Sequence, residues 1–166
     1  MERTGLSIAG GILLLLASIC TGIGGTYFAA TGNLERLLPV WRAKMTEDDK
    51  AGKLKPEQKQ QLETSFAEAE AKLADPEFRA RLAKLKAYGY FEIAAALVGL
   101  IAAIAVLAAT AFGRVAGPIG AVLGAATCVW ALIIGAPAQV QGAFLIAYVV
   151  AFAGALALRP RAPTTI

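Results

Sequence analysis

The chain alternates between long apolar runs and one long polar stretch. Four runs of about 20 residues are almost free of charged side chains, and at 1.5 Å per residue a helix of that length crosses a hydrocarbon core of about 30 Å. We therefore predict four membrane-spanning helices and a short basic tail, with chain breaks where Gly and Pro gather at 113–118 and 135–137. The predicted spans are 6–30, 91–112, 115–134 and 140–158, and the tail is 159–166.

The polar stretch between the first two spans, residues 33–86, carries three apolar stripes at helical spacing. The first predicts an amphipathic helix that Pro39 kinks or delays, and the other two predict a helical hairpin. The second helix is acidic and the third is basic, so we expect these two to pair through complementary charge. No breaker follows Pro76, which predicts that the third helix runs on into the second span. The stripes are Leu34, Leu37, Leu38, Trp41 and Met45; Leu62, Phe66, Ala69 and Leu73; Phe78, Leu82 and Leu85.

An alternative places the first of these helices flat on the membrane, with Leu38 and Trp41 dipping into the interface. In either case the pattern indicates an all-α fold, an integral membrane four-helix bundle with an extramembrane helical hairpin between spans one and two. Composition agrees, because 57% of the residues are hydrophobic and 17% are charged, whereas soluble domains hold roughly 25% charged residues.

The first run also has the start of a signal peptide, with Arg3 before an apolar segment and Cys20 after a short box of small residues. Ile19 is too large for the position before a cleavage site, and the apolar run continues well past Cys20. We therefore interpret residues 6–30 as a retained membrane anchor.

Sixteen Lys and Arg and twelve Asp and Glu give a net charge of +4. Basic and acidic residues alternate along the polar stretch, which does not favour a nucleic-acid-binding surface. Because most basic residues lie in this loop, the positive-inside rule predicts a cytoplasmic loop with both termini outside, in a bacterial-type plasma (inner) membrane. The opposite orientation stays open, because the loop nearly reaches the length at which loops translocate regardless of charge.

Small residues recur at helical spacing in every span and predict close helix packing, since lipid provides no hydrophobic drive between helices. Two interpretations stay open: the ridges pack the bundle internally, or one ridge docks a partner chain or a second copy. The packing candidates are Gly11, Ser18, Gly22 and Gly25 in the first span, Gly99 in the second, Gly120 and Gly124 in the third, and Ala147, Ala151 and Gly154 in the fourth.

Residues 47–58 resemble a degenerate EF-hand calcium loop of twelve residues. Asp49 matches the third position and Gly52 the invariant sixth. The ligand set departs from the pattern, because Glu47 stands first and Gln58 replaces the bidentate glutamate at position twelve. A polar turn followed by a helix cap is the alternative, and we expect no metal site.

Glu92 is the ionisable group at the edge of a predicted span. A carboxylate inside a membrane is a candidate site for protons or cations. Its position beside Tyr88, near the membrane surface, favours instead an interfacial side chain that reaches water. Gln139, Gln141 and Thr127 are expected to bridge helices.

The chain has no histidine, and its two cysteines, Cys20 and Cys128, fall within spans. No catalytic set, cofactor site or metal site is recognisable, so an enzyme is disfavoured. The sequence favours a non-catalytic accessory or scaffold subunit, with the lipid bilayer and a membrane protein partner or a second copy as its partners. The alternatives are an oligomeric channel or transporter using Glu92, and a membrane enzyme acting on lipid or quinone.

Overall fold

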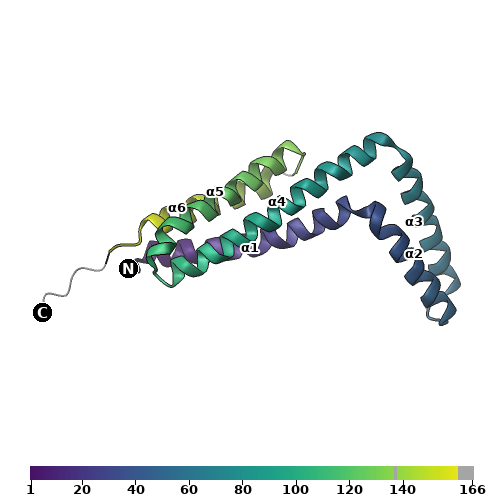
Figure 1. Cartoon of the computed structure of the whole chain (residues 1–166), viewed down its shortest axis with the longest axis horizontal. Helices are drawn as coiled ribbons and strands as arrows, with labels where there is room; N and C mark the ends of the chain where they lie inside the picture. The colour runs from purple at the N-terminus through teal and green to yellow at the C-terminus, as the bar shows by residue number, and fades with distance from the viewer. Residues whose placement is uncertain (137, 161–166) are drawn as a thin grey trace, which may run out of the picture. The chain divides into compact units, whose positions relative to one another are not determined.

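A computed structural model of the protein describes residues 1–136 and 138–160, which form six α-helices (Figure 1). Apart from these helices, the described residues contain one isolated antiparallel β-bridge, between Glu2 and Arg159. The predicted all-α fold is confirmed, whereas Pro137 and the tail after Pro160 lie outside the described residues. The helices are α1 (Gly5–Gly32), α2 (Leu34–Lys50), α3 (Pro56–Ala74), α4 (Pro76–Leu107), α5 (Ala111–Ile133) and α6 (Ala138–Leu156).

Four of the helices in the described part of the chain, α1, α4, α5 and α6, are long and apolar enough to cross a membrane. Their outward side chains are large and aliphatic, as a hydrocarbon environment requires. On α1 these exposed apolar side chains extend from Leu6 to Tyr27, which is about 32 Å of helix. The chain is therefore a small integral membrane protein.

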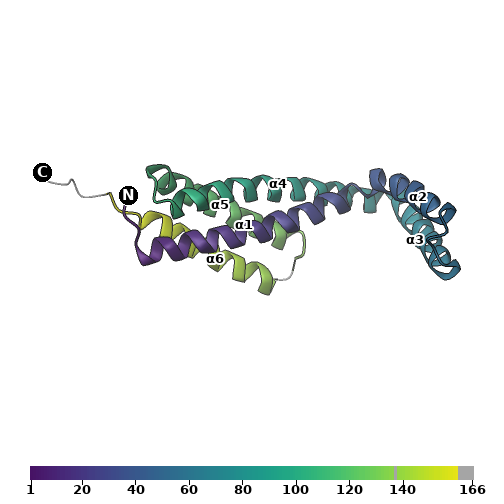
Figure 2. The same cartoon turned by 90° about the horizontal axis from the view of Figure 1, so that it is seen from below.

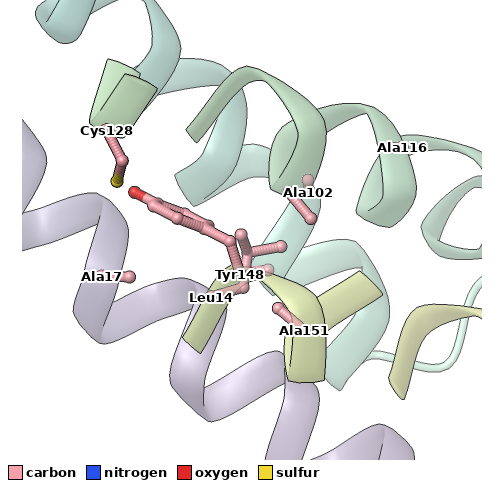
Figure 3. Close-up of a cluster of buried hydrophobic side chains, with 9 residues drawn as sticks. Leu14, Ala17, Ala102, Ala116, Cys128, Tyr148 and Ala151 are labelled. Carbon is pink, nitrogen blue, oxygen red and sulfur yellow. The ribbon is translucent and has the colours of Figure 1, made fainter. Parts of the chain in front are cut away.

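The four spans form a compact unit built from Met1–Thr26 and the chain from Tyr90 onward. Each helix contacts two neighbours, in the order α1, α4, α5, α6 and back to α1. The core is made mostly of alanines around the ring of Tyr148, whose hydroxyl lies beside the sulfur of Cys128 (Figure 3). A core of small side chains lets the helices approach closely, which is how spans associate in lipid.

The second unit, Tyr27–Gly89, contains the end of α1, the helices α2 and α3, and the start of α4. A turn at residues 51–55, with Gly52 at φ +67°, joins α2 to α3. These two helices lie side by side in both views (Figures 1 and 2), and Arg42 of α2 forms an ion pair of 2.6 Å with Glu70 of α3.

Helix α4 is continuous from Pro76 to Leu107, as the sequence predicts. Asp75 caps it, because its carboxylate accepts the backbone N–H of Glu77 at 2.9 Å. Pro39 lies inside α2, so that helix begins before the proline and not after it.

The predicted pairing of α3 with the basic start of α4 is wrong. Helix α3 pairs with α2, and none of the ion pairs among the described residues joins α3 to α4. Connection length explains the difference: an antiparallel helix pair needs a loop of about two to five residues, and only Asp75 separates α3 from α4. The turn at residues 51–55 is long enough for α2 and α3.

The predicted break between spans two and three is also misplaced, since the turn lies at residues 108–110. Ala109 ends α4 in the left-handed region at φ 53°, and the side chain of Thr110 caps α5 by accepting the N–H of Gly113 at 3.0 Å. Helix α5 then continues through Gly113 and Pro118. Phe112 therefore belongs to the third span and not to the second.

Candidate functional site

The small-residue ridges face other helices of the same chain. A Cβ atom added to Gly10 would lie 2.8 Å from the Cα atom of Gly154, so α1 and α6 touch backbone to backbone. Gly99 packs against the hydroxyl of Ser18 between α4 and α1, and Gly120 lies over Gly99 between α5 and α4. These contacts support the internal-packing interpretation of the ridges.

The remaining predicted packing residues lie on the same inner faces. Gly124 lies against the ring of Tyr148, and Gly11 lies against the side chain of Leu107. Gly25 and Ala151 are buried, whereas Gly22 and Ala147 are half-buried. Gly113 and Gly117 also belong to this packing, although their sequence context predicts a chain break. In the structure they bring α5 close to α4 and α6.

Glu92 is buried inside the bundle, with 7% of its surface exposed. The expectation that this side chain reaches water is therefore wrong, because neighbouring helices cover it. Its depth near the membrane surface stays a prediction. Both carboxylate oxygens lie over Gly24 of α1, at 3.5 and 3.9 Å from where a Cβ of that residue would stand. A methyl group at residue 24 would therefore make ordinary van der Waals contact with the carboxyl group.

Polar side chains from other spans gather in the same bundle. Thr21 and Tyr148 share a buried hydrogen bond of 2.7 Å between their hydroxyls, which joins α1 to α6. The hydroxyl of Thr127 on α5 donates to the carbonyl of Gly124 at 2.7 Å. These groups bring hydrogen-bonding capacity and one carboxyl group into a span, which is the chemistry of a proton or cation site.

The loop that resembles an EF-hand uses its side chains for other contacts. Glu47 and Asp49 lie in the last turn of α2, and Asp49 accepts a hydrogen bond of 2.7 Å from the amine of Lys59. This hydrogen bond and the charge of Asp49 hold the pKa of Lys59 above its usual value. Gln58 caps α3 by accepting the backbone N–H of Lys55 at 3.1 Å. Among the described residues, no three potential metal ligands gather.

An apolar groove of about 440 Å³ runs between α2 and α3. Along α2 it extends from Leu34 to Asp48, about 21 Å of helix. The sequence predicts the apolar faces of α2 and α3 that line this groove. It does not predict the groove, because a groove forms only where these two helices pair. The apolar lining is Leu34, Leu38, Trp41, Met45, Leu54, Leu62, Phe66 and Ala69.

The groove stays open to solvent on one side. Phe66 at its floor is buried, whereas Trp41 and Leu62 remain 47% and 37% exposed. Lys44 and Asp48 stand at the groove with opposite charges. Exposed aromatic and aliphatic side chains beside such a hollow are typical of a surface that binds another molecule.

Comparison of the chain with known protein families, curated proteins and solved structures gives no match.

Proposed function

We propose that the protein is a non-catalytic membrane subunit that uses the groove between α2 and α3 to hold a helix of a partner protein. The groove is the observation that carries this proposal. Its walls are two helices with aliphatic and aromatic side chains, and its length of about 21 Å accommodates roughly four turns of a third helix. An amphipathic helix lying in an apolar groove is a common mode of peptide recognition.

The contacts within the bundle also support the hairpin, and not the spans, as the part that binds a partner. The glycine ridges of the spans are occupied by neighbouring helices of the chain, as between Gly10 and Gly154. The outer surface of the bundle is aliphatic and suited to lipid. The hairpin is then the part that meets a partner, with Trp41 as its anchor, since tryptophan is enriched among residues that dominate binding energy.

A charge placed in the groove should abolish partner binding. Leu62→Glu puts a carboxylate against the apolar face of the docked helix, and an uncompensated charge there should lower the recovered partner at least about tenfold. The measurement is the quantity of co-purifying protein when the full chain is isolated from native membranes in mild detergent.

Gln60→Glu is the matched control, because Gln60 is exposed on the same helix and does not line the groove. It should leave the recovered partner unchanged. Equal recovery with Leu62→Glu and with the native chain, or a native chain that purifies as a monomer without any other protein, would refute the proposal.

The burial of Glu92 favours a second candidate, an oligomeric channel or transporter for protons or monovalent cations. Glu92→Gln keeps the size of the side chain and removes its charge, so it should abolish flux into liposomes that contain the full chain while leaving the helical content unchanged. Absence of flux with the native chain would eliminate this candidate.

The cytoplasmic position of the hairpin stays a prediction from the distribution of basic residues, and reporter fusions within residues 50–55 and after Ile166 decide it.

A further inference from the structure

The charges of the extramembrane segment are divided unequally along it. The two membrane-proximal parts, residues 33–46 and 76–88, hold seven basic and two acidic residues, a net charge of +5. The distal part, residues 47–75, holds five basic and eight acidic residues, a net charge of −3. The positive charge of this segment is therefore concentrated where the chain leaves the membrane.

Five of these basic residues form what we call the basic collar: Arg36 on α2, and Arg79, Arg81, Lys84 and Lys86 on α4. The four on α4 precede Tyr90 by four to eleven residues, which corresponds to about 6 to 17 Å of helix. Arg36 follows the end of α1 at Gly32 by four residues.

The collar surrounds the start of α4. The buried or half-buried stripe of that segment is Phe78, Leu82 and Leu85. At 100° per residue, Arg79 and Lys86 flank the stripe on one side, and Arg81 and Lys84 flank it on the other.

No ion pair of a collar side chain is present in the part of the chain that the structure describes. Three ion pairs occur among the described residues, Arg42 with Glu70, Lys53 with Asp48 and Lys59 with Asp49, and none of them includes a collar residue. Four of the five collar residues are exposed and Lys86 is half-buried. The acids of the proximal parts, Glu35 and Glu77, lie in the first turns of α2 and α4, where they complement the helix dipole.

Exposed tyrosines mark where the two helices leave the hydrocarbon, Tyr27 on α1 and Tyr90 on α4. The headgroup layer on each side of a bilayer is about 5 to 8 Å thick, and charges act over a Debye length of about 8 Å at physiological ionic strength. The collar therefore lies within reach of the headgroups. A cluster of four to eight basic residues directly beside a membrane helix is typical of anionic-lipid binding.

We propose that the basic collar binds the headgroups of anionic phospholipids and thereby holds the base of the hairpin at the membrane surface. The ligand is the phosphate of a lipid and not an acidic protein, because headgroups are present at this depth wherever the protein resides. This inference is independent of the groove and of its partner.

The test measures lipid selectivity of the purified full chain. The chain is reconstituted in phosphatidylcholine vesicles that contain spin-labelled phosphatidylglycerol or spin-labelled phosphatidylcholine, and electron paramagnetic resonance gives the ratio of their association constants. We expect a preference of about fivefold for phosphatidylglycerol, the factor that corresponds to one surface charge. At 1 M salt, where the Debye length is about 3 Å, the ratio should approach one.

Two charge-matched variants locate the effect. The collar variant replaces Arg79, Arg81, Lys84 and Lys86 with Gln and should lose the preference. The distal variant replaces Lys50, Lys53, Lys55 and Lys72 with Gln, removes the same charge, and should keep it.

The proposal is overturned if the native chain shows no preference at low salt, a result that would point to an acidic protein as the ligand of the collar. It is equally overturned if the collar variant keeps the preference or if the distal variant loses it to the same extent. The salt titration of the native chain does not depend on how well either variant folds.

Discussion

Gly124→Leu is expected to lower the thermal stability of the membrane bundle severely. A Cβ atom at this position of α5 would overlap the ring of Tyr148, and the rest of a leucine side chain has no space. The ring cannot move aside easily, because it is 2% exposed at the centre of the core and its hydroxyl is bonded to Thr21. Overpacking costs about 1 to 3 kcal/mol, and breaking a buried hydrogen bond adds about 1 to 3 kcal/mol.

The measurement is the unfolding midpoint of the full chain in mild detergent, followed by circular dichroism. Gly142→Leu is the matched control, because Gly142 is also a glycine within a span but has no atom near the place of its Cβ. The control should melt as the native protein does. A native melting temperature for Gly124→Leu would show that α5 and α6 are not packed as described.

Gly154→Leu should weaken the contact between α1 and α6 and lower the stability of the bundle at least as much as Gly124→Leu does. Its Cβ atom would lie 2.6 Å from the carbonyl oxygen of Leu6 and 2.8 Å from the Cα atom of Gly10. Both are backbone atoms, so no side-chain rotation relieves the clash and the two helices must separate. We expect a loss of about 3 kcal/mol or more, at the upper end of overpacking effects.

Thiol labelling reports this separation directly. Cys128 is buried in the core, with 3% of its surface exposed, and it should react much faster with a maleimide in the Gly154→Leu variant than in the native chain. Ala153 directly precedes Gly154 on α6 and is exposed. The control variant Ala153→Leu should leave the labelling rate of Cys128 unchanged. Equal rates in all three proteins would contradict the backbone contact.

The spans and the continuity of α4 could be predicted from sequence because they depend on local properties. An uncharged run of about 20 residues has few stable states other than a membrane helix. Between Pro76 and Leu107 no residue interrupts the helix, so an extramembrane helix and a span fuse into one. Asp75 before Pro76 is a strong local signal for the start of a helix, because Asp is a favoured N-cap and Pro is favoured at the first helical position.

The turn between α4 and α5 could not be predicted, because its residues carry weak signals. A left-handed residue after a helix is usually glycine, and here it is Ala109. Gly113 and Pro118 are stronger signals, and they wrongly predict a chain break at residues 113–118. Gly113 is needed where α5 crosses the backbone of Ala105, and α5 accommodates Pro118 within its length.

The environment of Glu92 and the groove depend on tertiary contacts that single-sequence patterns do not contain. Hydropathy placed Glu92 near the membrane surface but could not show that α1 presents Gly24 to it. The stripes of α2 and α3 identified their apolar faces. Which helix α3 joins was decided by the lengths of its two connections.

We expect the hairpin groove to contact a protein and the outer surface of the bundle to contact lipid. A photoreactive amino acid placed at Leu62 in the groove or at Val122 on the exposed face of α5 tests this directly in native membranes. We expect a protein adduct of defined mass at position 62 and lipid adducts alone at position 122. Protein adducts at position 122 with none at position 62 would contradict it.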